Sequence, residues 1–335
     1  MIAAVHFSNF RALRSAAVKL TPFNLVIGPN GSGKTSLIQA LVRLRTLAAL
    51  PAVHAQELRG APVGGPRIEF HFAPPFQEVR VTLGCSADQF TCNLLVVDHP
   101  PGLVGEGLWG ELRTRLQTIQ AYLFDHTVMA APARVADGTV LAGDSGNLAA
   151  VLARRRTEAP AAFNRLVAEF SRIMPEFFGL EFRPVGTDRV ELGGRLAGPG
   201  EFVPAENLSQ GTLYLLAILA VAHDPAPPGV VCLEEADRGV HPRMLREVRD
   251  TLYRLSYPKE TGEDRPPVQV IATTHSPYLL DLFKDHPDEV VLANKHGSAA
   301  TFERLSERAD ILELLRETNL GDLWYSGILG GVPGE

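Results

Sequence analysis

The sequence predicts an α/β fold with a mixed core sheet, and three observations favour it. Residues 25–41, LVIGPNGSGKTSLIQAL, combine an apolar run, a glycine-rich turn and apolar residues at helical spacing. From residue 229 onward, strand-like apolar runs alternate with helical patterns, which is typical of a parallel sheet with crossover helices. The 335 residues are 45% hydrophobic and 21% charged, as in a protein with a substantial core.

The composition excludes several classes of protein. The net charge of −6 gives no global attraction to nucleic acid. The longest apolar run, 213–222, is shorter than the roughly 20 residues that span a bilayer. The three cysteines have no metal-ligand spacing, and their odd number without a secretion signal is typical of a reducing compartment. We therefore expect a cytoplasmic protein that does not enter the membrane.

The elements follow in chain order. We expect strands at IAAVHF, SAAVKL and FNLVI, then a helix over about 34–47, and further strands at RIEFHF, EVRVTLGC, TCNLLVV and IQAYLFD. Residues 147–175 predict two helices broken near Pro160, and a long buried helix follows Ser209. Strands at GVVCLEE, VQVIATT and DEVVLAN then alternate with helices at HPRMLREVRDTLYRL and PYLLDLF.

The turn at 28–35, GPNGSGKT, fits the G-x-x-x-x-G-K-[ST] pattern of a phosphate-binding loop. Its glycines let successive backbone N–H groups point at an anion. The helix that starts near Lys34 presents its positive end to the same anion. We expect Lys34 to reach the β- and γ-phosphates of a nucleotide and the Thr35 hydroxyl to ligate Mg²⁺. The pattern alone does not separate a kinase, a GTPase, a transporter ATPase and a motor.

Two later strands end in chemically active side chains. The apolar run 229–233 is followed by Glu234, which fits the place of an acid near Mg²⁺, and by Glu235, which could orient or deprotonate an attacking water. The run 268–274 is followed by His275, which we expect near a γ-phosphate. The carboxyl ends of parallel strands are where such sheets bind ligands. A solvated strand end and a structural histidine are the plain alternatives.

The stretch ENLSQGTLYLLAILAVAH, 206–223, predicts a second helix start. Ser209 is a good N-cap, and Gly211 keeps the first turn bare of side chain. Such a helix end has a preference for anions. An ordinary capped core helix is the alternative that this stretch alone favours.

The order of four motifs along the chain resembles that of the ABC ATPase superfamily. The phosphate loop comes first, followed by the L-S-x-G segment, the strand ending in two acids and the strand ending in histidine. The likeness is to the RecF/SMC/OLD-like branch rather than to transporter ATPases. Four stretches carry it: SNFRAL, GDSGNLAAVL, EEADRGVHP and TTHSPYLLD. The resemblance covers nearly the whole chain, and the chain is similar to a standalone OLD-like ATPase. No D-x-D cluster follows His275, so a fused nuclease domain is not expected.

The resemblance implies a phosphate-loop NTPase of the ABC/SMC-head type, as a single composite domain over 1–335. The nucleotide-binding core would be 1–50 and 205–335, with a β-rich lobe at 60–125 and a helical lobe at 145–205. The segment between Thr35 and Leu208 is too short and too rich in proline for long coiled-coil arms.

The resemblance also implies roles for single residues. ATP binding falls to Arg11 and to the loop residues Gly28, Asn30, Gly31, Ser32, Gly33, Lys34, Thr35 and Ser36. Glu234 and Thr35 would serve Mg²⁺, while Glu235 and His275 would be catalytic. The signature residues Ser209, Gln210 and Gly211 would close over the ATP of a second subunit.

The sequence departs from the superfamily pattern in three ways. The metal-binding acid is Glu234 rather than Asp, and the signature LSQGT ends in threonine. The glutamine of the Q-loop is not identified, and the candidates are Gln77, Gln117 and Gln120. A GTPase is excluded because VVLANKHG has glycine where the N-K-x-D motif needs aspartate.

The function we expect is an ATP hydrolase that forms an ATP-dependent homodimer and acts in DNA repair or anti-phage defence, with DNA or a separate effector protein as partner. A nucleotide-gated scaffold with slow hydrolysis and a transporter ATPase subunit are the alternatives. One group of arginines could bind nucleic acid phosphates or form a solvated face: Arg154, Arg155, Arg156, Arg165 and Arg172.

Overall fold

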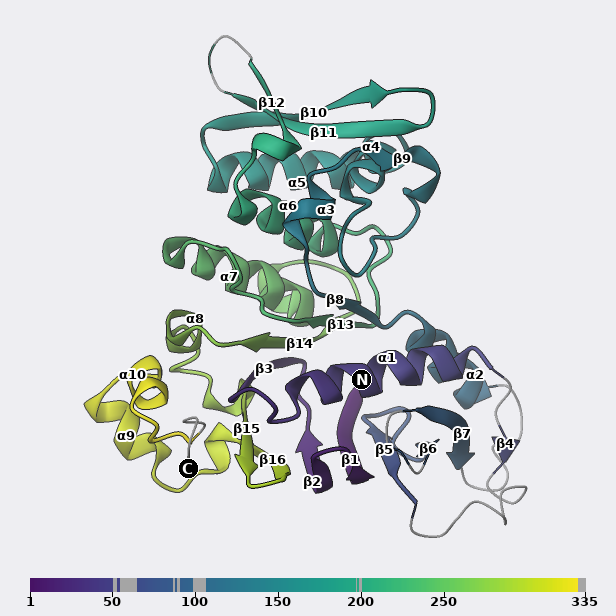
Figure 1. The fold of residues 1–335 in the computed structure, drawn as a ribbon, viewed down its shortest axis with the longest axis vertical. Helices are drawn as coiled ribbons and strands as arrows, with labels where there is room; N and C mark the ends of the chain where they lie inside the picture. The colour runs from purple at the N-terminus through teal and green to yellow at the C-terminus, as the bar shows by residue number, and fades with distance from the viewer. Residues whose placement is uncertain are drawn as a thin grey trace. The chain divides into compact units, whose positions relative to one another are not determined.

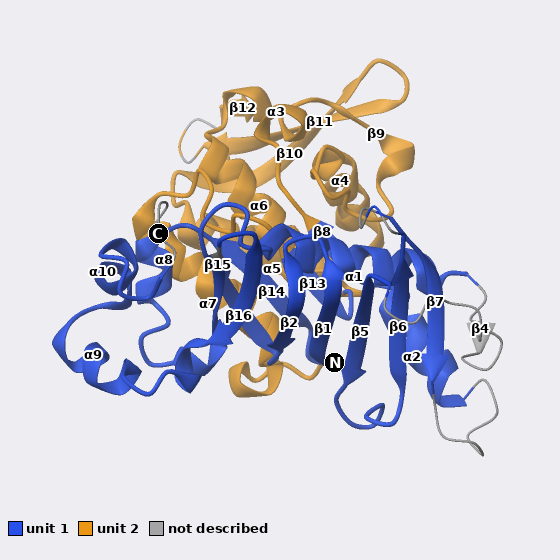
Figure 2. Cartoon of the chain, turned by 60° about the horizontal axis from the view of Figure 1, so that its bottom comes forward, with its two compact units in different colours: residues 1–121, 228–232, 267–335 blue, residues 122–227, 233–266 orange. Residues whose placement is uncertain are grey.

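The structure is a computed structural model that describes residues 1–50, 53–54, 65–86, 88, 91–98, 107–196, 198 and 201–330. The chain forms two compact units, coloured blue and orange in Figure 2. Unit 1 contains residues 1–121, 228–232 and 267–335, and unit 2 contains residues 122–227 and 233–266. The chain therefore passes repeatedly from one unit to the other.

The first sheet of unit 1 has the strand order β2-β1-β5-β6-β7-β4. Its strands are β1 (Ile2–Phe10), β2 (Leu13–Lys19), β4 (Val53–His54), β5 (Arg67–Phe72), β6 (Arg80–Cys85) and β7 (Cys92–Asp98). Buried and less buried residues alternate along β5, as the side-chain period of a strand requires. Its buried side chains, Ile68, Phe70 and Phe72, join the apolar face of helix α1 (Lys34–Ala48) in one core. Helix α2 (Gly107–Gln117) packs beside α1.

The second sheet has the order β16-β15-β3-β14-β13-β8. Its strands are β3 (Phe23–Ile27), β8 (Gln120–Tyr122), β13 (Val230–Leu233), β14 (Gln269–Thr274), β15 (Val290–His296) and β16 (Ala299–Arg304). Strand β3 is parallel to both β14 and β15 and is buried along its whole length. A strand covered on both faces is a continuous apolar run, which is why FNLVI shows no alternation. Strand β8 is shorter than the IQAYLFD run suggested.

Unit 1 ends in short helices: α8 (Pro277–Asp281), α9 (Ile311–Glu317) and α10 (Leu320–Tyr325). Helix α8 has the expected start, because the Ser276 side chain accepts from the Leu279 N–H and Pro277 occupies the first turn. The N–H of Gly321 in α10 donates to Asp281 of α8 over 2.6 Å. Across the described parts of the chain, no helix has both the length and the apolarity to cross a membrane.

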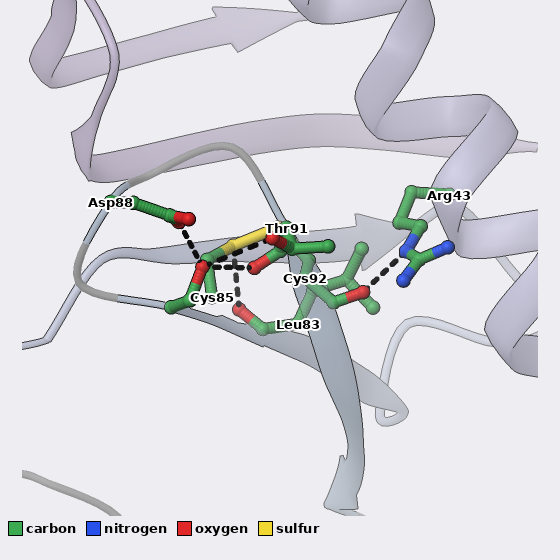
Figure 3. Close-up of a disulfide and its surroundings, with 7 residues drawn as sticks. Arg43, Leu83, Cys85, Asp88, Thr91 and Cys92 are labelled. Atoms are coloured by element: carbon green, nitrogen blue, oxygen red, sulfur yellow. Dashed lines mark hydrogen bonds between the residues drawn. A yellow bond between two sulfur atoms is a disulfide. The ribbon is translucent and has the colours of Figure 1, made fainter.

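A disulfide joins Cys85 at the end of β6 to Cys92 at the start of β7 (Figure 3). Arg43 of α1 donates a hydrogen bond to the carbonyl of Cys92. The third cysteine, Cys232, is free and buried in β13. The register of β6 and β7 places Cys85 opposite Cys92, a pairing that the sequence analysis did not consider.

Unit 2 combines helices with a small antiparallel sheet. Its helices are α3 (His126–Met129), α4 (Leu148–Glu158), α5 (Pro160–Ile173), α6 (Gln210–Ala222) and α7 (Leu245–Ser256). The break between α4 and α5 lies at Pro160, as predicted, and α6 is buried along nearly its whole length. The sheet contains β9 (Ala133–Arg134), β10 (Phe177–Val185), β11 (Arg189–Leu196) and β12 (Phe202–Pro204).

The hairpin of β10 and β11, visible in Figure 1, lies in the segment for which the sequence analysis expected only a helical lobe. That segment is helical only as far as Ile173. The hairpin turn contains Gly186 at φ 63°, a conformation that glycine adopts without cost. Buried and exposed side chains alternate only weakly along its strands. A search for apolar runs therefore does not detect them.

Glu169 joins three helices of unit 2. Its carboxylate on α5 accepts hydrogen bonds from Arg254 of α7 at 2.6 Å and from Thr251 of α7 at 3.3 Å, and it lies 2.6 Å from Nε2 of His223 at the end of α6. Burial alone would raise the pKa of Glu169, but the hydrogen bonds from His223 and Arg254 lower it to about 2. The carboxylate therefore stays charged and holds the helices together.

Candidate functional site

The phosphate loop connects β3 to α1, where the sequence predicts it. Gly31 and Gly33 have φ values of 76° and 97°, which other residues rarely adopt. A Cβ on Gly28 would lie 2.2 Å from the carbonyl oxygen of Ala293, so only glycine fits there. Backbone conformation therefore requires glycine at 31 and 33, and packing against Ala293 requires it at 28, independently of any ligand.

Two polar side chains of the loop fit an anion. Lys34 is 8% exposed, and its Nζ donates to the carbonyl oxygens of Gly28 and Pro29 at 2.6 and 2.9 Å. The hydroxyl of Ser32 is buried and has no hydrogen-bond partner in the described part of the chain. A buried hydroxyl without a partner is costly, and a phosphate oxygen in the loop would satisfy it. Asn30 and Thr35 are exposed, and Ser36 is half-buried.

Arg11 lies next to the helix that follows the loop. It occupies the turn between β1 and β2 with φ 54°, a left-handed conformation that is uncommon for arginine. Its guanidinium donates to the side chain of Gln39 on α1 and lies 5.1 Å from the ring centre of Phe10. The SNFR stretch therefore brings a cation to the helix of the phosphate loop.

His275 directly follows β14, and its neighbour Thr274 pairs with Ile27, the last residue of β3. The carboxyl ends of the two parallel strands meet at one edge of the sheet, so His275 and the start of the phosphate loop share that edge. The imidazole is exposed. Unit 1 thus contains the loop, Arg11 beside the helix that follows it, and His275 at the sheet edge where the loop begins.

Lys295 is a further cation that the sequence analysis did not assign. It belongs to β15, and a Cβ built on Gly31 would lie 3.5 Å from its Nζ. The dipeptide Asn294-Lys295 was considered only as a fragment of a GTPase motif. Only the pairing of β15 with β3 shows that it lies beside the loop.

The two acids follow β13 and are part of unit 2. The N–H of Glu234 donates to the carbonyl of Tyr122 over 2.9 Å. Glu235 has φ 52°, in the left-handed region, and its carboxylate lies 3.7 Å from Nε of Arg238. Strained backbone of this kind occurs most often at functional sites.

The signature residues form the start of α6, also in unit 2. The Ser209 hydroxyl accepts from the N–H of Thr212 over 3.1 Å, which confirms the predicted N-cap. Ser209 is exposed and Gln210 is half-buried. A Cβ on Gly211 would lie 2.7 Å from the carbonyl of Gly239, in the turn after the acid pair. The absence of a side chain at Gly211 also allows these two backbone segments to touch.

The structure places the three glutamines proposed for the Q-loop in different surroundings. Gln117 closes α2 and donates to the carbonyl of Ala48 over 3.1 Å. Gln120 begins β8 and accepts from Arg45 over 2.9 Å. Gln77 is exposed outside the helices and strands. Gln117 and Gln120 thus fix local packing of unit 1.

Much of the arginine group on the helices serves internal contacts. Arg155 is buried and pairs with Asp224 at 2.5 Å, Arg154 pairs with Glu158 at 2.7 Å, and Arg172 pairs with Glu247 at 2.6 Å. Arg156 lies over the ring of Phe182 at 4.9 Å. These contacts favour a structural role over nucleic acid binding for four of the five arginines.

The described residues contain no group of three or more His, Cys, Asp or Glu side chains that could hold a metal ion. The metal site expected here does not need such a group. Phosphate-loop proteins usually hold Mg²⁺ through one hydroxyl, one carboxylate and the oxygens of the nucleotide.

Comparisons with known proteins agree with this architecture. A family model described as "AAA ATPase domain" matches residues 1–52, which contain Arg11 and the phosphate loop. A second model, described as "AAA domain, putative AbiEii toxin, Type IV TA system", matches residues 144–281, which contain the signature, the acid pair and His275. No curated protein sequence matches the chain.

Two solved structures are similar in fold. An SMC head bound to the C-winged helix domain of ScpA superposes with a TM-score of 0.59 at 15% identity, covering 90% of this chain and 96% of that one. An Smc head domain with an extended coiled coil, bound to the C-terminal domain of ScpA derived from Pyrococcus furiosus, gives 0.55 at 15% identity, covering 94% and 99%. At this identity the likeness shows the fold, which is that of an ABC-type phosphate-loop ATPase head.

Proposed function

This chain is an ABC-superfamily ATPase of the RecF/SMC-like type, and from that premise we propose that it binds ATP with Mg²⁺ and hydrolyses it. The observation that carries the proposal is the interior of the phosphate loop. There the Lys34 ammonium contacts two loop carbonyls and the buried Ser32 hydroxyl has no partner in the described residues. Both groups would gain a phosphate oxygen as ligand.

Different residues of the chain have different roles in binding and hydrolysis. The loop N–H groups and Lys34 hold the β- and γ-phosphates, and Arg11 adds a cation from the β1–β2 turn. Thr35 and Glu234 would hold Mg²⁺, which would supply positive charge against the phosphate charge that develops in the reaction. Glu235 accepts the proton of the attacking water, and His275 donates to the γ-phosphate. The left-handed backbone of Glu235 supports this assignment because strain of this kind collects at active sites.

The start of α6 suggests that the site is completed by a second subunit. A helix N-terminus favours an anion, and Ser209 is exposed there. We place the γ-phosphate of a partner chain opposite this helix end. Because one chain carries both the phosphate loop and the signature, an identical partner forms two equivalent sites related by a two-fold axis.

We place the ATPase cycle in DNA repair or anti-phage defence, with a separate effector protein. The SMC heads of similar fold are bound to domains of ScpA, and the second family model is described by a toxin system. A nucleotide-gated scaffold with slow hydrolysis is the second candidate. The presence of both Glu235 and His275 favours hydrolysis over it.

Titration with a fluorescent ATP analogue tests the binding step. Lys34→Ala removes the cation from the loop and should abolish tight binding while the circular dichroism spectrum stays unchanged. Lys259→Ala removes an equal charge from an exposed position of unit 2 and should bind like the wild type. Unchanged affinity in Lys34→Ala would contradict the assignment of the loop.

A further inference from the structure

Strand β15 forms one wall of the phosphate loop. It is parallel to β3, with Leu292 opposite Ile27, so the residues after these two pass the edge of the sheet together. A Cβ on Gly28 would lie 2.2 Å from the carbonyl oxygen of Ala293 and 2.9 Å from its Cβ. The first residue of the loop therefore packs directly on β15.

Lys295 points to the same side of β15 as Ala293. Successive side chains of a strand alternate between its two faces, so residues two apart share a face. The position of the ammonium agrees, since a Cβ built on Gly31 would lie 3.5 Å from Nζ of Lys295. Ala293 thus contacts the start of the loop and Lys295 lies over its middle.

Among the described residues, the Lys295 ammonium has no structural partner. The side chain is exposed, and no hydrogen bond or ion pair joins it to the part of the chain that the structure describes. By contrast, Lys34 is buried and donates to the carbonyls of Gly28 and Pro29. The loop therefore has one cation held at its start and a second, unneutralised cation at Gly31.

We propose that Lys295 is a second cation of the nucleotide site and binds a phosphate that ATP and ADP share. The inference rests on the proposed binding of ATP at the loop. The strand order places β15 and β14 on opposite sides of β3. His275, which we assign to the γ-phosphate, follows β14, so Lys295 lies on the side away from it. A lysine is a point charge on a flexible stem, suited to a phosphate without fixed geometry.

A contact with a shared phosphate is uniform binding, which changes affinity and leaves the chemical step unchanged. Lys295→Ala should weaken the binding of both ATP and ADP by about tenfold, the usual scale for a lost hydrogen bond to a charged group. The ratio of the two dissociation constants and kcat at saturating ATP should stay as in the wild type. Lys295→Arg, which keeps the charge, should restore most of the affinity.

The measurement is calorimetric titration of the full chain with ATP and with ADP in the presence of Mg²⁺, with Lys259→Ala as the matched control. If Lys295→Ala binds both nucleotides like the wild type, the proposed role of Lys295 is wrong, while the proposal that the loop binds ATP is unaffected. If it weakens ATP alone, or lowers kcat, the assignment to a shared phosphate is wrong. If the wild type binds neither nucleotide, the proposed function fails first, which separates the two outcomes.

Discussion

At the scale of single residues, Glu235 combines a strained backbone with a position two residues after the buried strand β13. A left-handed conformation costs a non-glycine residue about 1–3 kcal/mol. Two backbone hydrogen bonds hold the segment in place, from Glu234 to Tyr122 and from Arg238 to Glu235, each 2.9 Å long. These bonds hold the backbone of the segment in place on both sides of Glu235 before any ligand binds.

Glu235→Gln tests the role of this carboxylate. Glutamine keeps the shape and loses the proton acceptor, so ATP should bind normally while hydrolysis slows by at least about 10²-fold, the usual scale for a general base. Steady-state phosphate release, with ATP affinity measured in parallel, checks this. Turnover close to that of the wild type would move the catalytic role to another group, with His275 the next candidate.

At the scale of elements, the stability of unit 2 depends on the contacts of Glu169 with α6 and α7. Its side chain is 9% exposed, and the pKa is lowered to about 2 by His223 and Arg254 against the opposing effect of burial. A pKa that is lower in the folded state stabilises the fold above the pKa of the unfolded chain, near 4.5. The stabilisation is lost as the pH falls from about 4.5 to about 2.

Glu169→Gln should therefore lower the free energy of unfolding by roughly 3 kcal/mol at pH 7, and this difference should shrink as the pH falls through that window. Urea unfolding at a series of pH values measures it. Glu158→Gln is the control, because the pair of Glu158 with Arg154 is exposed and such pairs contribute about 0–1 kcal/mol. A difference that does not depend on pH would show that the charge of Glu169 is not what stabilises the helices.

At the scale of the whole molecule, one chain carries two places suited to phosphate. Unit 1 contains the phosphate loop, and unit 2 contains the exposed helix start at Ser209. One loop is sufficient to bind a nucleotide, and our proposal is that the second helix start faces a nucleotide on another chain. ADP lacks the γ-phosphate, and only ATP should therefore join two copies.

We predict that Glu235→Gln forms a stable homodimer with ATP and Mg²⁺ but not with ADP. Adding Ser209→Arg should block closure through bulk and charge while each monomer still binds ATP. Ser209→Ala is the matched control, since it removes the cap at a cost of about 1 kcal/mol and adds neither bulk nor charge. Light scattering after size exclusion gives the masses. The same mass with ATP, with ADP and without nucleotide would exclude the shared site.

The sequence by itself determined the features that depend on neighbours along the chain. The phosphate loop needs glycines at 31 and 33, where the structure shows φ values of 76° and 97°. The caps at Ser209 and Ser276, the break at Pro160 and the buried helix after Ser209 also follow from local rules. These elements begin close to where the sequence predicts them, because a turn of helix or a tight loop is specified within a few residues.

Only the tertiary structure decided which distant segments meet. It paired Cys85 with Cys92, placed Lys295 over Gly31, gave Gly211 a contact with Gly239, and formed the hairpin of β10 and β11. Each depends on the register of strands or on backbone contacts between segments that no local pattern relates. The free energy that selects them comes from burying the faces of whole sheets and helices, so a single residue's spacing carries little information about its partner.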